Sequence, residues 1–258
     1  MQRRDVLPWA IDRCGPPETS AVLDGLFEPG IGVACGDPRA NWPPALPLEE
    51  ASIRHAVAKR QLEFRAGRAL AREAMAGLGL PPFPVPVAED RAPIWPEGLV
   101  GSISHCDDLC VVAVGRRSDG VVAIGVDVEP AQPLPDDVRD EICLAEEKAW
   151  LSGLDQRNRL LFERLIFCAK ESAYKCQYGV TGQMFGFDAL CVRVDRARFQ
   201  FEARFTRPIG PFRFGQALVG RYVMTEQHLV AGMDLGVGSM ANSGQFEIGR
   251  GNRDLSPR

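Results

Sequence analysis

The chain has 258 residues, of which 45% are hydrophobic and 25% charged, and its formal net charge is -4 at neutral pH. These values are typical of a soluble globular protein with one large domain or two small ones. The negative charge argues against a nucleic-acid binder, and no window approaches the roughly 18 apolar residues that a membrane helix needs. No apolar signal core follows Met1–Asp5. We therefore expect a cytoplasmic protein that binds neither nucleic acid nor membrane.

The cysteines are scattered and never form a CxxC motif with a second Cys or His pair. In a reducing compartment we expect free thiols that act as small apolar residues, and no zinc site. They are Cys14, Cys35, Cys106, Cys110, Cys143, Cys168, Cys176 and Cys191.

Residues 1 to 48 are rich in Pro and Gly, with short apolar runs, such as Ile31–Cys35, that fit strands at a sheet edge. From Leu48 to Gly77 the pattern is helical and free of proline, with a small-residue packing face formed by Ala66, Ala69, Leu70 and Ala74. The proline-rich segments 81–84 and 91–96 predict a break and an ordered loop.

Basic residues collect on the predicted helix. Arg65, Arg68 and Arg72 lie at i, i+3 and i+7, with Lys59 and Arg60 one to two turns earlier. Such a face is either simply solvated or placed to meet an anion.

The next segment predicts a hairpin. Gly101–His105 leads into the apolar run 109–114, residues 116–120 form a turn, and a strand runs from Val121 to Glu129. His105 then opens one strand, and Asp127 and Glu129 close the other. Residues 130–135 end this sheet segment.

The second part of the chain repeats this organisation. Helices are predicted at 136–150 and 155–178, the latter between an Asp155 N-cap and a Gly179 C-cap. Strands are predicted at 190–194, 199–203 and 220–224, and segment 225–233 resembles 104–114 in pattern. We infer an α+β protein with an N-terminal half, 1–118, a C-terminal half, 119–237, and a disordered tail, 238–258.

Two motifs carry the chemistry. Asp127 and Glu129 share one face of their strand, while Glu171 and Lys175 lie one helical turn apart. Carboxylates without His or Cys partners suit a hard cation such as Mg²⁺, which phosphates of a substrate often complete. A nearby lysine can offset charge on a phosphate oxygen. Taken singly, each motif also fits polar residues before a turn or an ordinary helix ion pair.

Several blocks in this order resemble the signatures of the 4'-phosphopantetheinyl transferases. They are Gly125–Glu129, Phe167–Lys175 and Ser102–His105, and Glu63–Arg68 with Arg91–Pro96 resemble the enterobactin-synthase type within the monomeric, surfactin-type class. The resemblance implies a pseudo-dimeric α+β fold, in which two similar halves each pack an antiparallel sheet against a long helix. Coenzyme A and Mg²⁺ would bind between the halves.

The resemblance also implies residue roles. Asp127, Glu129 and Glu171 would hold Mg²⁺, and Lys175 would contact the coenzyme A pyrophosphate and the leaving 3',5'-ADP. Ser104 and His105 would hold the 3'-phosphate, with Arg60, Arg68 and Arg91 near this phosphate and the adenine; a dianion there favours a protonated His105. The general base is Glu171 by first choice and Glu147 by second.

The implied reaction transfers the 4'-phosphopantetheine arm of coenzyme A to a serine of an apo acyl or peptidyl carrier protein. The carrier protein is expected to be acidic and the enzyme a monomer. Two alternatives remain open: a non-catalytic coenzyme A or carrier-protein binding module of the same fold, and another Mg²⁺ phosphotransferase. The chain has no GxxxxGK[ST] loop for the latter.

Overall fold

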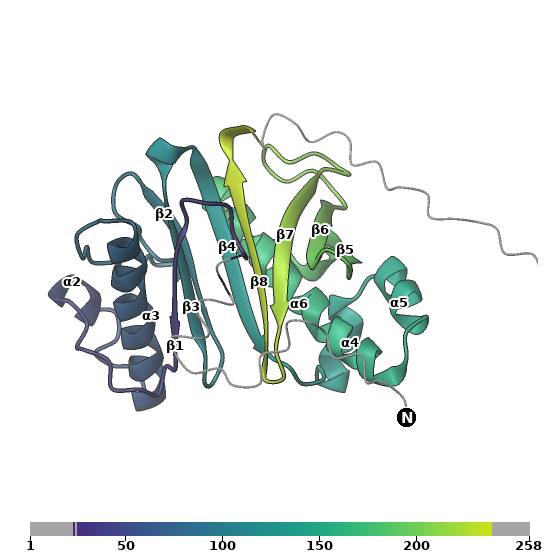
Figure 1. Cartoon of the computed structure of the whole chain (residues 1–258), viewed down its shortest axis with the longest axis horizontal. Helices are drawn as coiled ribbons and strands as arrows, with labels where there is room; N and C mark the ends of the chain where they lie inside the picture. The colour runs from purple at the N-terminus through teal and green to yellow at the C-terminus, as the bar shows by residue number, and fades with distance from the viewer. Residues whose placement is uncertain (1–22, 24, 239–258) are drawn as a thin grey trace, which may run out of the picture.

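The computed structural model describes residues 23 and 25–238, and the predicted disordered tail lies almost wholly outside this range. Two antiparallel sheets stand side by side, with helices α2 and α3 at one end and α4 and α5 at the other (Figure 1). The expected α+β architecture of two halves is confirmed. No helix in the described part of the chain is long and apolar enough to span a membrane.

The first sheet has the strand order β1-β3-β2 and the second β4-β8-β7-β6-β5. The strands are β1 Gly32–Gly36, β2 Leu99–His105, β3 Cys110–Arg116, β4 Val121–Pro130, β5 Leu190–Asp195, β6 Gln200–Phe205, β7 Ala217–Met224 and β8 His228–Gly236. The helices are α2 Pro47–Glu50, α3 Ala58–Gly77, α4 Asp136–Ile142, α5 Ala145–Ser152 and α6 Gln156–Thr181, with short 3-10 turns at Arg117–Asp119 and Phe187–Ala189.

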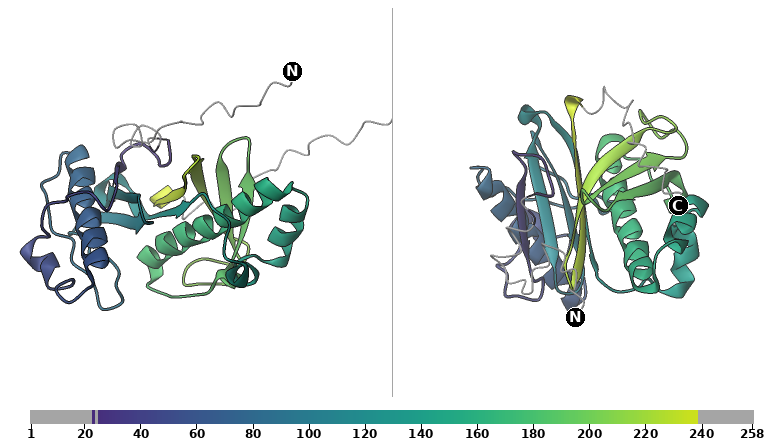
Figure 2. Two further views of the ribbon diagram at one scale, coloured as in Figure 1. Left: turned by 90° about the horizontal axis from the view of Figure 1, so that it is seen from below. Right: turned by 45° about the vertical axis from the view of Figure 1, so that its right-hand side comes forward.

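Side chains that alternate between the two faces of each strand divide the hydrophobic core into separate clusters. On β3, Cys110, Val112 and Val114 face α3, whereas Val111 and Ala113 face a second cluster shared with the other sheet. On β4, Ile124, Val126 and Val128 enter that shared cluster. The intervening residues of β4 therefore face α6, because successive side chains of a strand point to opposite faces. Figure 2 shows α3 and α6 on the outer sides of the two sheets.

The two sheets meet edge to edge at β2 and β4, without a shared backbone ladder. The Ser102 hydroxyl accepts a hydrogen bond from the Val126 N–H at 3.0 Å. A side chain thus satisfies a backbone donor that a neighbouring strand would otherwise pair. The seam between the halves is consequently lined by the serines of β2.

The predicted hairpin of residues 105–114 with 121–129 is wrong. β3 pairs with β1 and β2, and β4 pairs with β8 in the other sheet. His105 ends β2 and does not open β3. Both strands are rich in buried apolar residues, so their composition could not identify their partners.

Helix boundaries also differ from the predictions. The helical pattern from 48 to 77 is broken between Glu50 and Ala58, and the predicted helix 136–150 is two helices that meet at residues 143–144. Asp155 is confirmed as the N-cap of α6, since its side chain accepts the Asn158 N–H at 3.0 Å. The C-cap is Gly182, with φ 64°, and not Gly179, which stays inside the helix. Six described cysteines are free thiols, namely Cys106, Cys110, Cys143, Cys168, Cys176 and Cys191.

Candidate active site

The site begins with a very close approach of α6 to β4. A Cβ at Gly125 would lie 1.9 Å from the Ser172 backbone oxygen and 2.8 Å from the Cys176 backbone nitrogen. Only glycine admits a helix backbone this near to a strand. The Ser172 hydroxyl, in turn, donates to the Gly125 carbonyl at 3.0 Å. This contact brings the side chains of α6 within reach of the strand carboxylates.

Asp127 is the centre of the site and only 4% exposed. Its Oδ1 accepts hydrogen bonds from the Ser104 hydroxyl and from Lys175 Nζ, both at 2.7 Å. Its Oδ2 is buried and has no hydrogen-bond partner among the described residues. A buried carboxylate oxygen without a donor is costly, so this atom is suited to a cation that enters the site.

Glu129 lies two residues further along the same face and is held by Arg164, whose Nη1 is 2.7 Å from Oε2. Burial and then the Asp127 charge raise the pKa of Glu129 to about 7, and Arg164 offsets only part of this effect. Arg164 also donates to the Gln132 and Pro133 carbonyls at 3.0 and 2.7 Å. The arginine therefore ties the site to the loop after β4.

Glu171 and Lys175 come from α6. Burial, followed by repulsion from Asp127, raises the pKa of Glu171. Burial by itself lowers the pKa of Lys175, but the Asp127 carboxylate raises it above its usual value. Lys175 also donates to the Ser104 hydroxyl at 3.0 Å and the Val126 carbonyl at 3.2 Å. It is thus a fixed positive charge between the two halves.

The three carboxylates Asp127, Glu129 and Glu171 are candidates for holding a divalent cation, although their oxygens do not all lie within 4.8 Å of one another in the described structure. Burial, and then the nearby Asp127 charge, raise the pKa values of Glu129 and Glu171, and among the described residues Asp127 keeps an unpartnered oxygen. Three oxygen donors suit a hard ion. Two basic side chains already lie beside these acids: Lys175 forms an ion pair with Asp127, and Arg164 forms one with Glu129.

The basic end of the site lies where β2 ends against α3. Arg60 Nη1 lies 2.9 Å from His105 Nε2. Because a guanidinium only donates, Nε2 acts here as an acceptor and the imidazole is neutral. Burial lowers the pKa of His105, and Glu63, 3.6 Å away, partly opposes this. His105 is expected to be protonated only when a phosphate is bound beside it, and that expectation stays a prediction.

A small hollow adjoins this end of the site. Its volume is about 280 Å³, and its lining comprises Pro38, Arg39, Lys59, Leu62, Glu63 and Asp107. Lys59 is paired with Asp107 at 2.7 Å. The hollow thus has two basic and two acidic side chains in its lining, beside the apolar Pro38 and Leu62.

Arg68 and Arg91, the other basic residues predicted for the site, have surroundings that differ from those of Arg60 and His105. Arg68 is buried, stacks 4.2 Å over the Phe64 ring and donates from Nε to the Val85 carbonyl at 2.6 Å. Burial lowers its pKa to about 10. Arg91 is exposed and adopts φ 72° in the ordered loop. That loop is fastened to α6 by a hydrogen bond from the Tyr178 hydroxyl to Asp90.

Two family models match the chain. Residues 48–115 match the 4'-phosphopantetheinyl transferase N-terminal domain, and residues 123–225 match the 4'-phosphopantetheinyl transferase superfamily. Svp of Streptomyces mobaraensis, a 4'-phosphopantetheinyl transferase, is 42% identical over 175 residues, which cover 67% of this chain and 70% of Svp. The chain belongs to the 4'-phosphopantetheinyl transferase superfamily.

Other relatives agree. Npt of Nocardia iowensis, also a 4'-phosphopantetheinyl transferase, is 42% identical over 144 residues, or 56% of this chain and 64% of Npt. Enterobactin synthase component D of Salmonella typhi is 34% identical over 125 residues, which cover 48% of this chain and 50% of that protein. The expected relationship to the enterobactin-synthase type is confirmed. This chain is therefore an enzyme of the phosphopantetheinyl transferase class, which acts on coenzyme A and carrier proteins and uses a divalent metal.

Glu147, the second candidate base of this transferase, forms an ion pair and hydrogen bonds outside the site. Its side chain is fully buried and forms an ion pair with Lys170 at 2.8 Å. Its oxygens also accept the N–H groups of Leu144 and Val192, each at 2.6 Å. The carboxylate thus caps α5 and joins it to the edge strand β5.

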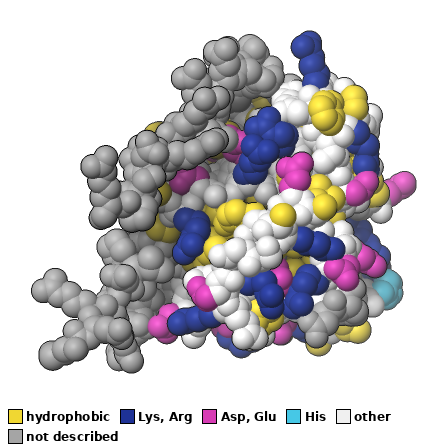
Figure 3. Space-filling model, turned by 90° about the vertical axis from the view of Figure 1, so that its right-hand side faces the viewer, with side chains coloured by type: hydrophobic (Ala, Val, Ile, Leu, Met, Phe, Trp, Pro, Cys, Tyr) yellow, Lys and Arg dark blue, Asp and Glu magenta, His cyan; other side chains and the backbone are white. Residues whose placement is uncertain are grey.

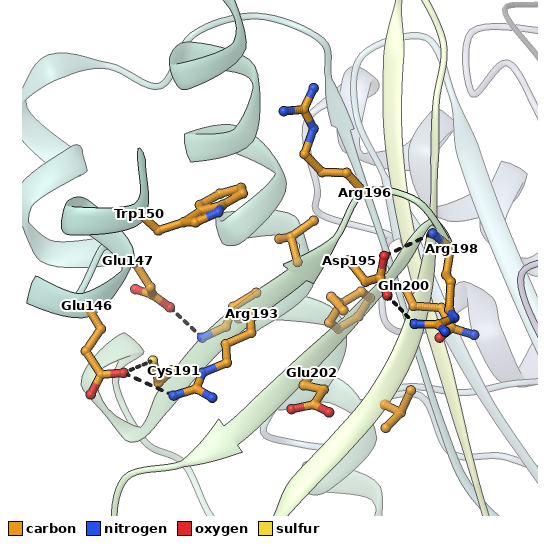
Figure 4. Close-up of a pocket in the computed structure, with 14 residues that line it drawn as sticks. Glu146, Glu147, Trp150, Cys191, Arg193, Asp195, Arg196, Arg198, Gln200 and Glu202 are labelled. Carbon is orange, nitrogen blue, oxygen red and sulfur yellow. Dashed lines mark hydrogen bonds and ion pairs between the residues drawn. The ribbon is translucent and has the colours of Figure 1, made fainter. Parts of the chain in front are cut away.

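A larger hollow of about 820 Å³ lies beside β5, at the opposite edge of the second sheet from β4. Trp150, Arg193 and Arg196 are among its lining side chains (Figure 4). The molecular face toward α4, α5 and β5 mixes basic and acidic side chains (Figure 3). The sheet order separates this hollow from the carboxylates of the transferase.

Sequence reasoning missed two residues of the site. Arg164 lies on the same stripe of α6 as Cys168, Glu171 and Lys175, at i, i+4, i+7 and i+11, so the helical period contained the signal. Gly125 was noticed only as part of a motif, and its steric role required the position of α6. The structure brings Asp127, Ser104 and Lys175 into direct contact and places Arg60 against His105.

Proposed function

We propose that this enzyme transfers the 4'-phosphopantetheine arm of coenzyme A to a serine of an apo acyl or peptidyl carrier protein, with Mg²⁺ as the divalent metal, and releases 3',5'-ADP. The observation that carries the proposal is the meeting of Asp127, Lys175 and Ser104 at the seam of the two halves, with Oδ2 of Asp127 unpartnered. An acid-rich site beside a fixed lysine suits a metal and a pyrophosphate together.

Asp127, Glu129 and Glu171 are the proposed Mg²⁺ ligands. When bound, Mg²⁺ supplies charge neutralisation for the transferred phosphoryl group. Lys175 would face the pyrophosphate, because its ammonium group already lies between Ser104 and Asp127 and remains protonated. It would offset the negative charge that develops on the leaving 3',5'-ADP.

Ser104, His105 and Arg60 are the proposed contacts of the 3'-phosphate. Arg60 and His105 already touch each other beside the small hollow, so a phosphate there would meet two donors once His105 is protonated. Arg91 would reach the nucleotide from its exposed loop. For Arg68 we propose a positioning role, since it holds the Val85 carbonyl at the start of that loop.

Glu171 is the proposed general base. Its raised pKa suits a carboxylate that takes the proton of the attacking serine, whereas both oxygens of Glu147 are engaged by Lys170 and two backbone N–H groups. The halves 1–118 and 119–237 are the proposed domains. We also propose a monomeric enzyme, because side chains of both halves of one chain meet at the proposed site.

The test is intact-protein mass spectrometry of several apo carrier proteins incubated with the enzyme, coenzyme A and Mg²⁺. We expect a gain of one phosphopantetheine arm that EDTA prevents. Asp127→Asn should abolish the gain, and Asp140→Asn, the same change at an exposed ion pair with Lys148, should retain it.

Two outcomes would contradict the proposal. Transfer by Asp127→Asn at the wild-type rate would remove the carboxylate from the mechanism. An absence of transfer to every carrier, with coenzyme A still bound in calorimetry, would favour the binding module of the same fold.

A further inference from the structure

A second group of ligand-type side chains lies outside the proposed active site. Within the described residues, Cys106, Asp108 and His228 are the only three Cys, His, Asp or Glu side chains whose ligand atoms all lie within 4.8 Å of one another. Cys106 Sγ is 3.5 Å from Asp108 Oδ1, and His228 Nε2 is 2.7 Å from the same oxygen. The three groups therefore converge on one point.

The three residues come from the two halves of the molecule. Cys106 and Asp108 form the turn between β2 and β3, which the Cys106 N–H closes on the Leu109 carbonyl at 2.9 Å. His228 begins β8, opposite Pro130 at the end of β4. It lies on the face of β8 that carries Val230, so it points to the core between the sheets and away from Asp127 and Glu129.

The donor set differs in kind from the carboxylates of the active site. A thiolate, an imidazole and a carboxylate are together typical of Zn²⁺ and related transition metals, and Mg²⁺ avoids sulfur and imidazole ligands. A tetrahedral ion with one sulfur and two lighter ligands spaces its donors roughly 3 to 4 Å apart. The Sγ to Oδ1 distance of 3.5 Å falls in this range.

Burial also suits a bound ion. His228 is 6% exposed, and Asp108 keeps 38% of its side chain accessible, so one ligand is fixed in the core and another opens to solvent. A thiolate and a carboxylate would balance the two charges of the ion. We propose that Cys106, Asp108 and His228 bind one Zn²⁺ ion, with solvent as a fourth ligand, and that this ion joins the β2–β3 turn to β8.

Binding would replace the hydrogen bond between His228 and Asp108, and the Cys106 thiol would give its proton to the buffer. His228 Nδ1 is buried, and no hydrogen-bond partner for it lies in the part of the chain that the structure describes. Metal-bound histidines normally donate this second N–H to an acceptor, which strengthens the site. The affinity should therefore be lower than that of a structural zinc site with such a second partner.

The consequence concerns the position of His105. The turn that contributes Cys106 and Asp108 follows directly after Ser104 and His105, whose side chains belong to the proposed coenzyme A site. An ion at this turn would fix the end of β2 relative to the second half. Zn²⁺ at this turn would thus stabilise the fold, and it would be a separate ion from the metal of the active site.

The experiment measures metal on the full chain, purified under reducing conditions, stripped with a chelator and dialysed against Zn²⁺. We expect one retained zinc per chain that excess Mg²⁺ does not displace. Co²⁺ in its place should give a thiolate charge-transfer band in the near ultraviolet. Cys106→Ser and His228→Gln should each abolish that band and weaken zinc binding by more than the roughly 10–100-fold lost when a secondary contact of a metal ligand is removed.

Cys191→Ser is the matched control, since the Cys191 thiol lies 3.8 Å from a carboxylate oxygen of Glu146 but belongs to no such three-residue group. It should keep the band. Circular dichroism and thermal unfolding of each stripped variant show whether it is folded, and Zn²⁺ should raise the unfolding temperature of the wild type but not of folded Cys106→Ser. Absence of zinc retention by the wild type, or an unchanged cobalt band in folded Cys106→Ser, would overturn the proposal.

Discussion

Glu129→Gln should stabilise the metal-free enzyme at neutral and alkaline pH while it impairs the metal site. Glu129 is buried beside Asp127, and its pKa lies at about 7 instead of 4.5. The native protein therefore binds the Glu129 proton more tightly than the unfolded chain does. The free energy of unfolding must then fall as the pH rises from about 4.5 to 7, because ionisation is harder in the folded state.

The size of this effect follows from the shift. A rise in pKa from 4.5 to about 7 corresponds to about 3 kcal/mol of stability that is present at low pH and lost above pH 7. Glutamine resembles the protonated acid at every pH. Arg164 would still donate to the Gln132 and Pro133 carbonyls, so the variant should not leave a buried guanidinium unsatisfied.

The assay is urea unfolding in EDTA across pH 4 to 8, read by circular dichroism. The two proteins should have equal stability near pH 4, and the variant should be more stable by up to about 3 kcal/mol at pH 8. Mg²⁺ should stabilise the wild type but not the variant. Glu97→Gln, at an exposed position, should change stability by less than about 0.5 kcal/mol. Parallel pH profiles, or a less stable variant at pH 8, would refute the reasoning.

Three further perturbations test other parts of the site. Gly125→Ala should destabilise the enzyme by about 3 kcal/mol or more in chemical unfolding, because the new Cβ meets backbone at 1.9 Å, whereas Gly153→Ala meets one oxygen at 3.4 Å and should be tolerated. Lys170→Met should lower the free energy of unfolding by about 3 kcal/mol, because it leaves Glu147 without its ion pair. A folded variant that loses turnover at unchanged stability would contradict the structural role of that pair. Tyr178→Phe should raise the KM for coenzyme A roughly threefold to tenfold with little change in kcat, because it releases the loop of Arg91; an unchanged KM would separate the loop from substrate binding.

Local pattern predicted the elements of this enzyme better than their partners. The period of two in β4 placed Asp127 and Glu129 on one face, and the Asp155 cap fixed the start of α6. The pairing of β4 with β8, about a hundred residues later, depends on which apolar strand fits the shared core. Such long-range choices leave little trace in the strand itself.

The helix errors have tertiary causes. Between α2 and α3 the chain turns so that buried Glu49 can accept the Val85 N–H at 2.8 Å and pair with Arg72 at 3.1 Å. These partners lie far along the sequence. At the end of α6, Gly179 is still helical, and a Cβ added to it would lie 3.4 Å from the Ala123 Cβ. Gly182 has the positive φ of a C-cap.

The basic stripe on α3 was misleading for the same reason. Periodicity grouped Arg65, Arg68 and Arg72 on one surface, but Arg68 is buried and Arg65 and Arg72 reach toward the acidic residues of α2. Arg60, one turn before this stripe, is the arginine that touches His105. The spacing of arginines along the sequence does not show which of them form ion pairs with carboxylates in the folded protein.

The carboxylates of the active site keep an energetic cost even though cations lie beside them. Asp127 and Glu129 are paired with Lys175 and Arg164, so the metal-free site already contains cations that limit the repulsion among its acids. Even so, one oxygen of Asp127 remains without a donor and the pKa values of Glu129 and Glu171 remain raised. Burial is the main cause of both shifts and the Asp127 charge the second, so the protein's own cations offset the cost of these buried acids only in part. A divalent ion would supply the remainder, and this residual cost of the folded, metal-free state is the physical reason that the site should select a metal.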